Sequence, residues 1–306
     1  MANIKARFSQ APDGQRARVK LIGLGSAGCN MIQGSQLPTV AFSTSASDLD
    51  RSHSDRRILM GQDRLIGLAQ TSHSVLKHLP SVIGHDVVDV LNNTDLAFLM
   101  CGLGGISGSL GLRLFSSIAR SKGSLDIVLA ATPFSVESVH RREFSAKILT
   151  EVLGSGALCI EFDNDKLSEL APNLPMSRAF TLMNGIMMRP VLDMCAVTSQ
   201  TDLGIMRQVI GTSTYGRFGL GLARGEDRVE KVVAESLSSP WFDYDLTDAT
   251  GAIAIYSSAD PWENDIGKIM AALEARLLRA NLAFGSYSDQ TLGDRIRLSV
   301  VLCKPR

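Results

Sequence analysis

The sequence reads Gly23-Leu24-Gly25-Ser26-Ala27-Gly28-Cys29-Asn30 after one apolar run and Gly102-Leu103-Gly104-Gly105-Ile106-Ser107-Gly108-Ser109 after another. A glycine-rich turn between a strand and a helix lets backbone N–H groups converge on a phosphate, and the N-terminus of the helix adds positive potential. A single turn of this kind also occurs where a strand simply packs close to a helix. Two of them in one domain predict a polyphosphate that is held from two sides, and therefore a nucleotide site.

Around the two turns, apolar runs alternate with stretches of helical spacing. Strands are predicted at residues 18–23, 40–42, 58–60, 95–100, 125–131 and 157–162, and helices from residue 30, at 75–91, at 110–119 and at 144–152. The strands are almost entirely apolar, which is typical of a parallel sheet covered on both faces. The predicted fold class is α/β, with a Rossmann-like parallel sheet that carries both turns.

The second part of the chain has a different pattern. Residues 178–197 form a long, methionine-rich helical stretch that contains Pro190. Beyond it, helices are predicted at 229–237 and 266–273 and strands at 251–256, 281–285 and 295–303, the last alternating like a half-exposed strand. The predicted division is a flexible N-terminal extension (1–17), a nucleotide-binding domain (18–177), a central helix (178–200) and a smaller α+β C-terminal domain (201–306).

Composition excludes several classes of function. The 31 basic and 31 acidic residues balance, so we expect no electrostatic binding to nucleic acid or to an anionic membrane. No apolar run approaches the roughly 18 residues that span a bilayer, and we expect neither a signal peptide nor direct membrane insertion. The five cysteines are odd in number and lack Cys-x-x-Cys spacing, which indicates buried thiols and a reducing cytoplasm. The five histidines show no metal-binding spacing.

The first turn taken alone fits a dinucleotide site. Its glycines have the Gly-x-Gly-x-x-Gly spacing, and Asp48 follows Gly28 by 20 residues, as the fingerprint requires. An NAD-dependent oxidoreductase is therefore one hypothesis. Against it, the second predicted strand ends near Phe42, well before Asp48, and the second turn has no role in a nicotinamide site. A P-loop is excluded because the chain contains no Gly-Lys-Ser/Thr sequence.

Several motifs, in this order along the chain, resemble those of the FtsZ proteins and, more distantly, of tubulin. They are the first turn, the second turn (similar to the tubulin signature), Pro133-Phe134 with Glu137 and Arg141, Asn164-Asp165-Lys166-Leu167, Gly225-Glu226-Asp227-Arg228, Leu237-Ser238-Ser239-Pro240 and Gly251-Ala252. The resemblance runs from about residue 18 to 303. It implies the tubulin/FtsZ fold, GTP or GDP as the ligand, Mg²⁺ as a companion of the triphosphate, and head-to-tail assembly of the chain with itself.

The nucleotide contacts are predicted from the two turns and, beyond them, from the resemblance. They are Gly25, Ser26, Ala27, Gly28, Asn30, Gly104, Gly105, Ile106, Ser107, Gly108, Ser109, Glu137, Arg141, Asn164, Phe180 and Asn184. Glu137 and Arg141 follow a strand that ends at Pro133, at the edge where ligands bind in open α/β sheets. Four residues apart on a helix, they also fit a simple surface ion pair.

The chain departs from the resembled family at several of these positions. Ile106 replaces a glycine, and a β-branched residue there would resist a positive φ. The residue that reads guanine in that family falls on Gly185, next to Asn184, and Phe180 is placed to stack on the base. Because Gly185 has no side chain, guanine selectivity is an open question.

The largest departure lies in the catalytic loop that the resemblance implies. The family's Asn-x-Asp-x-x-Asp pattern becomes Gln200-Thr201-Asp202-Leu203-Gly204-Ile205 in this chain. Asp202 is the predicted catalytic residue, with Gln200 nearby, and Ile205 occupies the position of the second carboxylate. Phosphoryl transfer to water depends on placed charge, so hydrolysis is predicted to be slow.

Two functional hypotheses follow besides the oxidoreductase. The first is an FtsZ-like, GTP-binding, self-assembling cytoskeletal protein of cell division or membrane remodelling. The second is a nucleotide-binding structural or regulatory module with little GTPase activity, which Ile205 favours. In the resembled family a linker and a short peptide that docks membrane-tethering partners usually follow the last strand, and this sequence ends at Arg306. We therefore expect either that the chain works without such anchors or that an unknown protein partner recruits it.

Overall fold

The computed structural model describes residues 4–8, 16–70, 83–171 and 175–305. Contacts between residues divide the chain into two compact units. The glycine-turn unit comprises residues 18–188, and the C-terminal unit comprises residues 189–306 together with residues 1–17. The long helix α9 (Met176–Val197) begins in the first unit and ends in the second.

The glycine-turn unit contains a six-stranded sheet in the order β7-β6-β5-β2-β3-β4, and all of its pairs are parallel. Its strands are β2 (Val19–Leu24), β3 (Thr39–Ser43), β4 (Arg56–Leu59), β5 (Leu96–Gly102), β6 (Leu125–Thr132) and β7 (Leu158–Asp163). Its helices are α1 (Gly25–Met31), α2 (Ala46–Asp50), α3 (Gln62–Gln70), α5 (His85–Val88), η3 (Asp89–Leu91), α6 (Ile106–Ser121), α7 (Val139–Leu153), α8 (Lys166–Leu170) and the first part of α9. The predicted parallel α/β architecture is confirmed.

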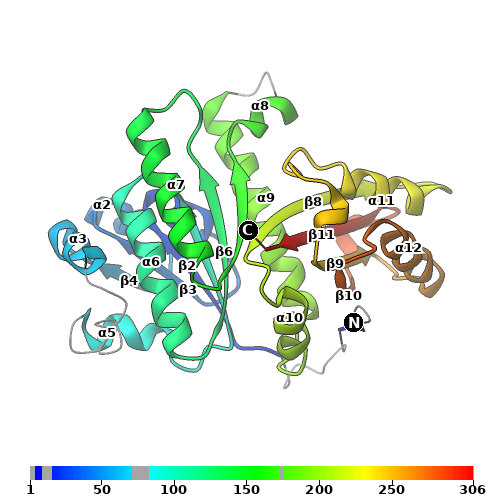
Figure 1. Cartoon of the computed structure of the whole chain (residues 1–306), viewed down its shortest axis with the longest axis horizontal. Helices are drawn as coiled ribbons and strands as arrows, with labels where there is room; N and C mark the ends of the chain where they lie inside the picture. The colour runs from blue at the N-terminus through cyan, green and yellow to red at the C-terminus, as the bar shows by residue number, and fades with distance from the viewer. Residues whose placement is uncertain (1–3, 9–15, 71–82, 172–174, 306) are drawn as a thin grey trace. The chain divides into compact units, whose positions relative to one another are not determined.

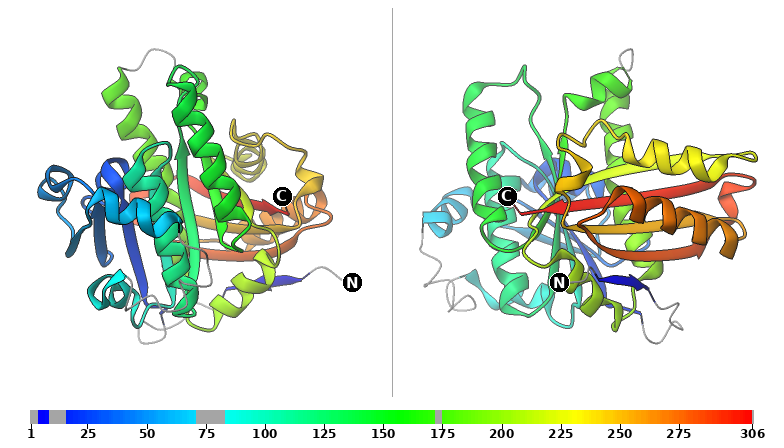
Figure 2. Two further views of the ribbon diagram at one scale, coloured as in Figure 1. Left: turned by 60° about the vertical axis from the view of Figure 1, so that its left-hand side comes forward. Right: turned by 45° about the vertical axis from the view of Figure 1, so that its right-hand side comes forward.

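The central strands of this sheet are buried along their whole length. Six of the seven residues of β5 are buried, and every residue of β6 is buried except Thr132. Helices α6 and α7 pack side by side along the strands (Figures 1 and 2). A strand with both faces covered favours apolar side chains on both of its faces, which explains the long apolar runs in the sequence. The exception in β6 is Asp126, which is buried and accepts a hydrogen bond from the hydroxyl of Ser116 (2.6 Å).

The C-terminal unit contains a five-stranded mixed sheet in the order β1-β10-β9-β11-β8. Its strands are β1 (Lys5–Arg7), β8 (Tyr215–Ala223), β9 (Gly251–Ser258), β10 (Asn281–Ser288) and β11 (Ile296–Lys304), and its helices are α10 (Asp202–Ile210), α11 (Arg228–Leu237), η4 (Leu246–Asp248), α12 (Glu263–Arg276) and η5 (Gln290–Leu292). Strands β1, β10 and β9 run parallel, whereas β11 is antiparallel to both of its neighbours.

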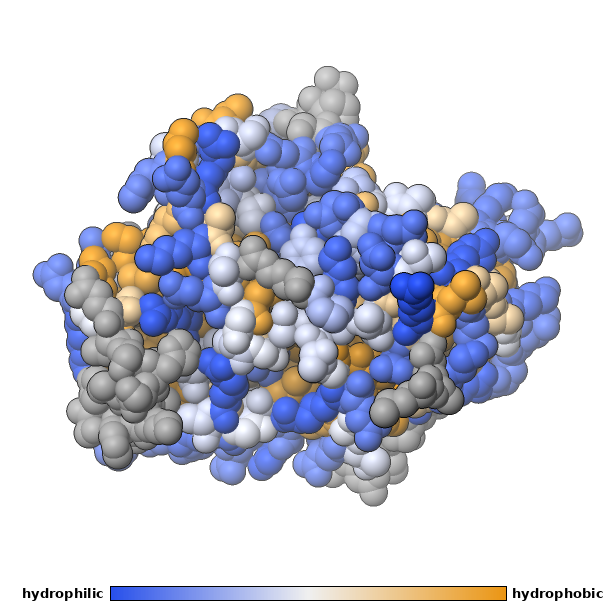
Figure 3. Space-filling view, viewed as in Figure 1, coloured by the Kyte–Doolittle hydropathy of each residue, from blue (hydrophilic) through white to orange (hydrophobic). Residues whose placement is uncertain are grey.

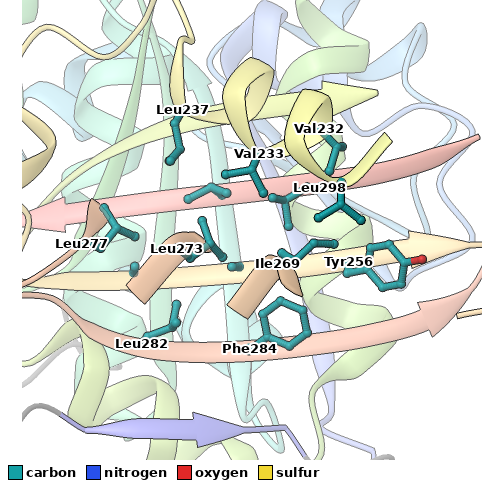
Figure 4. Packing of buried hydrophobic residues seen from close by; sticks show 14 of the residues in the cluster. Val232, Val233, Leu237, Tyr256, Ile269, Leu273, Leu277, Leu282, Phe284 and Leu298 are labelled. Atoms are coloured by element: carbon teal, nitrogen blue, oxygen red, sulfur yellow. The ribbon is translucent and has the colours of Figure 1, made fainter. Parts of the chain in front are cut away.

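The hydrophobic core of this unit lies between the sheet and the helices α11 and α12 (Figure 4). Val232 and Val233 of α11 and Ile269 of α12 point toward side chains of the strands, among them Tyr256 and Phe284. All five of these side chains are at most 2% exposed. The apolar spacing that predicts α11 and α12 therefore corresponds to their buried faces.

A buried polar cluster is built from the last part of α9 and the strands β10 and β11. The carboxylate of Asp193, fully buried, accepts hydrogen bonds from Tyr287 Oη (2.6 Å) and from Ser299 Oγ, and it pairs with Arg189 (2.6 Å). Arg297 donates to Tyr287 Oη (2.7 Å) and pairs with Asp289 (2.8 Å). Burial raises the pKa of Tyr287 to about 12, so the phenol stays neutral. We call these residues the Asp193 cluster.

The structure differs from the sequence prediction at both ends of this unit. Part of the predicted flexible extension is strand β1, which pairs with Leu282, Ala283 and Phe284 of β10. Strand β11, predicted to be half-exposed, is buried at every residue except Lys304. Its alternate polar residues Arg297 and Ser299 face the Asp193 cluster rather than water.

Three helices also differ from their predicted limits. Helix α1 begins at Gly25 and α6 begins at Ile106, so both helices start inside the glycine-rich turns. Of the helix predicted at 75–91, the structure describes only residues 83–91, which contain α5 and η3, and the remainder lies outside the described residues. No element was predicted from the sequence at helices α2, α3, α8 and α10 or at strand β8.

The described surface is chemically mixed. On the face in Figure 3, hydrophilic residues cover most of the area, with smaller hydrophobic groups between them. Within residues 4–8, 16–70, 83–171 and 175–305, no helix combines the length and the apolar character that a membrane crossing needs. All five cysteines are free thiols, and burial raises the pKa of Cys101 to about 12.

Candidate functional site

The two glycine-rich turns meet at one edge of the parallel sheet. Strands β2 and β5 are neighbours, with Leu24 opposite Cys101, so their carboxyl ends lie side by side. A Cβ on Gly25 would lie 2.8 Å from the backbone nitrogen of Gly108, which shows that the two turns touch. Gly25 also has a φ of +68°, a conformation that favours glycine. The first and second turns therefore form a single backbone surface.

Two helices begin at this surface. The N-cap residues are Leu24 for α1 and Gly105 for α6, and neither provides a side-chain cap. The first N–H groups of a helix have no partner within the helix, so they are available to an anion. Ile106 is the first helical residue of α6, and Gly104 takes the positive φ (+92°) of the turn. The isoleucine therefore needs no strained backbone.

A cavity of about 600 Å³ opens beside the turns, within the range typical of small-molecule sites. Thirteen of the sixteen predicted nucleotide contacts line it. They are Gly25, Ser26, Ala27, Asn30, Gly105, Ile106, Ser107, Gly108, Glu137, Arg141, Asn164, Phe180 and Asn184. All of these residues belong to the glycine-turn unit.

The other three predicted contacts, Gly28, Gly104 and Ser109, do not line the cavity. They pack against or bond to the backbone of the turns. Gly28 is so close to β5 that a Cβ would lie 2.1 Å from the carbonyl oxygen of Met100. Ser109 is fully buried, and its hydroxyl accepts a hydrogen bond from the N–H of Gly104 (3.0 Å). These residues hold the turns in shape.

Cys29 lies beneath the first turn. Its thiol contacts the carbonyl oxygens of Gly23 and Phe42, each at 3.7 Å. Burial raises the pKa of this thiol to about 11, so it remains neutral and acts as packing. The side chain at this position therefore points away from the cavity.

The polar lining of the cavity includes an unsatisfied amide. Asn164 is 8% exposed, and its Oδ1 is buried without a hydrogen-bond partner among the described residues. A buried acceptor of this kind costs free energy unless something donates to it. A ligand hydroxyl or amine in the cavity would supply that donor.

Glu137 and Arg141 form the ion pair that their spacing allows, at 3.1 Å, and both line the cavity. Glu137 also accepts a hydrogen bond from the N–H of Phe134 (2.9 Å), and Asp165 accepts one from the N–H of Ser135 (3.0 Å). The two carboxylates thereby fix the loop that follows β6. Contact of Glu137 and Arg141 with a nucleotide stays a prediction.

The predicted nucleotide contacts did not include several lining residues, chiefly Phe134, Val136, Met183 and Asp48. Phe134 did belong to a motif of the resemblance, and Asp48 was weighed only as the acid of a dinucleotide site. Phe134 and Phe180 form an edge-to-face pair with centroids 5.9 Å apart. The signal for Phe134 and Val136 was available, because they follow a parallel strand at its carboxyl end. Met183 lies three residues after Phe180, on the same side of α9.

Asp202 has a structural role in the C-terminal unit. It is 1% exposed, and its carboxylate accepts from the N–H (2.9 Å) and the hydroxyl (2.6 Å) of Ser199. The N–H of Asp202 donates in return to Ser199 Oγ (3.2 Å). This reciprocal pair has the hydrogen-bond pattern of a capping box and closes the turn that precedes α10. Gln200 is exposed and Ile205 is half-buried. The catalytic role of Asp202 stays a prediction.

Replacing Arg141 with alanine is expected to weaken GTP binding about tenfold. Arg141 is the only Arg or Lys among the described residues that line the cavity, and a charge-assisted hydrogen bond contributes about this much. Isothermal titration calorimetry measures the change. Arg142→Ala is the matched control, because Arg142 is exposed and does not line the cavity. Equal affinities for both variants and the parent would reduce Glu137 and Arg141 to a surface pair.

Two family models match this chain. One, described as the GTPase domain of the Tubulin/FtsZ family, matches residues 18–172. The other, described as the C-terminal domain of the FtsZ family, matches residues 215–304. The first of these segments contains both glycine turns and Asn164.

Whole proteins match along nearly the full length of the chain. It is 30% identical to Cell division protein FtsZ of Methanothermobacter thermautotrophicus, over 100% of this chain and 84% of that protein. It is 27% identical to Cell division protein FtsZ 1 of Thermococcus kodakarensis, over 94% of this chain and 80% of that protein.

Solved structures share the fold. An empty FtsZ dimer of M. jannaschii superposes with a TM-score of 0.83 and 23% identity, covering 95% of this chain and 89% of that chain. A GTPγS-bound protofilament of CetZ2 from Haloferax volcanii gives a TM-score of 0.75 and 20% identity, covering 93% and 92%.

Proposed function

This chain belongs to the tubulin/FtsZ family, and we therefore propose that it binds GTP and GDP and assembles with copies of itself as a cytoskeletal protein of cell division or cell shape. The observation that carries the proposal is the cavity at the two touching glycine turns, with the uncapped N-termini of α1 and α6 at its wall. Phosphates are the ligands that such a surface suits.

Calorimetric titration with GTP, GDP and NAD tests the ligand. We expect both guanine nucleotides to bind and NAD not to bind. Asp48, the residue that the dinucleotide hypothesis needs, lies in α2 and bonds with Ser43 (2.9 Å) and Arg51 (3.0 Å). A protein that bound NAD but neither guanine nucleotide would contradict the proposal.

Self-assembly is the second part of the proposal. It is supported by the family and by relatives whose solved structures are described as a dimer and as a protofilament. Light scattering of the purified chain, with GTP and without it, measures assembly. Scattering that does not respond to GTP at any protein concentration would favour the alternative of a nucleotide-binding module that does not polymerise.

The residues fit a magnesium ion that arrives with the triphosphate. Mg²⁺ keeps several waters and takes phosphate oxygens together with one or two carboxylates. Asp48 lines the cavity and would supply such an oxygen. Within the described residues, no group of three or more His, Cys, Asp or Glu side chains is arranged to hold a metal by itself. We place the protein in the cytoplasm, because all five thiols are free.

We propose that GTP hydrolysis is slow and requires contact between two copies of the chain. Gln200, which is exposed just before α10, offers its amide to a neighbouring molecule, whereas the carboxylate of Asp202 is buried and bonded to Ser199. At Ile205 a carboxylate is replaced by an apolar side chain. The placed charge that would orient an attacking water is therefore reduced.

Ile205→Asp is expected to raise the rate of phosphate release by about 10- to 100-fold, since the loss of one placed polar group typically costs about 100- to 1000-fold. Ile205→Asn is the matched control, because asparagine has the same size as aspartate but no charge. Phosphate release measured over a range of protein concentrations should rise more steeply than linearly. A parent rate that is fast and independent of concentration, or an Ile205→Asp rate equal to that of the parent, would contradict the proposal.

A further inference from the structure

The chain's own first strand, β1, covers the edge of the C-terminal sheet that β10 would otherwise form. Residues 5–7 pair in parallel with residues 282–284, and backbone hydrogen bonds of 2.8 Å extend the pairing to Ile4 and Phe8 at its two ends. Strand β10 has eight residues and β1 only three, so β1 covers less than half of β10. The edge of a sheet is a template on which an extended segment of another chain can pair.

Phe8 is the apolar anchor of this first segment. It is 7% exposed, and its ring lies against the backbone of Gly285 in β10. A Cβ on Gly285 would come within 2.9 Å of the ring of Phe8 and of the side chain of Val197. The absence of a side chain at residue 285 therefore provides the space that the ring fills.

Two cations of the segment contact acidic residues of α12. Lys5 pairs with Glu274 (2.6 Å), and Arg7 pairs with Glu263 (3.4 Å). Lys5 and Arg7 lie on one face of the strand, and Phe8 lies on the opposite face because side chains alternate along a strand. Exposed ion pairs add little affinity, but they select the segment and its register. Backbone pairing, an aromatic anchor and placed charges are the means by which a sheet edge recognises an extended peptide.

The segment is joined to the rest of its unit through residues 9–15, which lie outside the described residues. The description resumes at Arg16, which forms a β-bridge with Ser199. From Phe8 to Arg16 the chain can span at most about 28 Å. A second copy whose β10 lies within this distance of Arg16 is therefore within reach of the segment.

Exchange of the segment between two copies would change none of its contacts. Every copy carries both residues 4–8 and the β10 edge that binds them, so pairing between copies reproduces the same hydrogen bonds, ring contact and ion pairs. The choice between its own β10 and that of a neighbour then depends on the effective concentration of the neighbour. Assembly raises this concentration because it holds copies next to one another.

We propose that β1 is an exchangeable strand, which in the assembled protein pairs with β10 of a neighbouring copy and ties the two copies together. The partner is a second copy of this chain, because the segment that fits the edge is the chain's own residues 4–8. The inference rests on the self-assembly of the proposed function and adds a contact that strengthens it.

Two single-cysteine variants distinguish exchange from pairing within one copy. Ala6→Cys carries a new thiol on β1 only, and Ala283→Cys carries one on β10 only, at the position opposite Ala6. Opposed residues of neighbouring strands are about 5 Å apart, which suits a disulfide. Because Ala283 is fully buried, a disulfide between the two variants in an equal mixture requires β1 of one copy to lie on β10 of the other. Mass spectrometry of the linked peptides identifies this dimer.

Ala6→Cys mixed with Ala234→Cys is the matched control for chance collision. Ala234 is an exposed alanine of α11, which packs on β8 and β11. The parent measures linkage through its own five thiols. With GTP and mild oxidation, the mixture of Ala6→Cys and Ala283→Cys should give at least about tenfold more linked dimer than the control, since gains of this size and larger are usual when partners are held together.

A native contact allows a second measurement, which decides if Ala283→Cys fails to fold. A carbodiimide joins an ammonium to a carboxylate in contact with it, as Lys5 and Glu274 are. In an assembly of equal parts isotope-labelled and unlabelled full chain, exchange predicts linked Lys5–Glu274 peptides that contain one partner of each kind. Glu274→Gln removes the link and thereby confirms its assignment.

The outcomes separate this inference from the proposed function. Assembly with GTP in which every Lys5–Glu274 link joins peptides of one kind, and in which the cysteine mixture gives no more dimer than its control, would overturn the inference and leave the proposed function standing. A chain that does not assemble with GTP would contradict the proposed self-assembly. Links between labelled and unlabelled chains at high protein concentration would then still support exchange, and their absence would overturn it.

Discussion

Gly105→Asp is expected to lower the affinity for GTP by at least about 100-fold while leaving the folded protein as stable as the parent. Gly105 is the N-cap of α6, with ordinary extended backbone angles (φ −97°, ψ 153°), and a Cβ there would meet no atom within 4 Å. Aspartate is a preferred N-cap residue, so its carboxylate would bond to the free N–H groups of the helix. The same carboxylate would repel phosphate at short range, which at about 4 Å amounts to several kcal/mol.

Gly105→Asn separates the two contributions. Asparagine caps a helix as well as aspartate does but carries no charge, so it should weaken GTP binding by less than about tenfold. Gly108 is a poorer position for this experiment, since a Cβ there would lie 2.6 Å from the carbonyl oxygen of Gly102 and would disturb the turn itself. Calorimetry measures the affinity and thermal unfolding measures the stability. A stable Gly105→Asp protein that binds GTP like the parent would place the phosphates elsewhere.

Asp193→Ala is expected to destabilise the protein by about 3–5 kcal/mol, a large fraction of the stability of an ordinary domain. The substitution removes the buried anion that Arg189 and Tyr287 contact at 2.6 Å. Arg297 keeps its ion pair with Asp289, whereas Arg189 loses the carboxylate with which it pairs. A buried charge without its counter-charge is costly because water no longer solvates it. Urea unfolding followed by circular dichroism measures the loss.

Two further variants show how large this loss of stability is by comparison. Asp193→Asn keeps the size and one acceptor oxygen, so it should cost less than the alanine. Glu274→Ala breaks the ion pair between Lys5 and Glu274 (2.6 Å), whose side chains are 52% and 30% exposed. Exposed pairs contribute less than about 1 kcal/mol. If Asp193→Ala unfolded at the same urea concentration as Glu274→Ala, the buried cluster would contribute no more than a surface pair.

The strands of the glycine-turn unit could be predicted from sequence because burial on both faces produces runs of consecutive apolar residues. Residues 96–101 of β5 are apolar one after another, and residues 127–131 of β6 are too, after the buried Asp126. The starts of α1 and α6 could not be predicted in the same way. Glycine disfavours helices in general, yet close contact between the turns requires glycine at Gly25 and Gly108.

Some elements of the C-terminal unit, such as strand β8, have no clear pattern in the sequence. Strand β8 contains three glycines and so lacks a β-like pattern. The structure supplies the reason: a Cβ on Gly219 would lie 2.0 Å from the carbonyl oxygen of Ser236, because α11 packs directly on the strand. Helix α10 could have been predicted, because Ser199 and Asp202 have the spacing of a capping box, which often precedes a helix.

The candidate site was predictable where it depends on backbone turns and less so where it depends on a helix face. The turns, Glu137, Arg141 and Asn164 all follow strand ends, and topology brings such ends together. On α9 the choice between Asn184 and Gly185 depends on the rotation of the helix about its axis. Neighbouring residues of a helix differ by about 100° in direction, so an amino-acid sequence alone does not fix which of two neighbouring positions faces a cavity.

The pairing of β1 with β10 has a consequence for the order in which the protein matures on the ribosome. Residues 18–188 are contiguous and can fold as they emerge, whereas Lys5–Arg7 must wait for Asn281–Ser288, which are made nearly 300 residues later. At about 5–20 residues per second this delay is roughly 15–60 s. During that interval the first-made strand has no neighbour, and chaperones that hold extended segments have time to bind it. A pulse-labelled nascent chain should therefore become resistant to protease in residues 18–188 well before its N-terminal strand does.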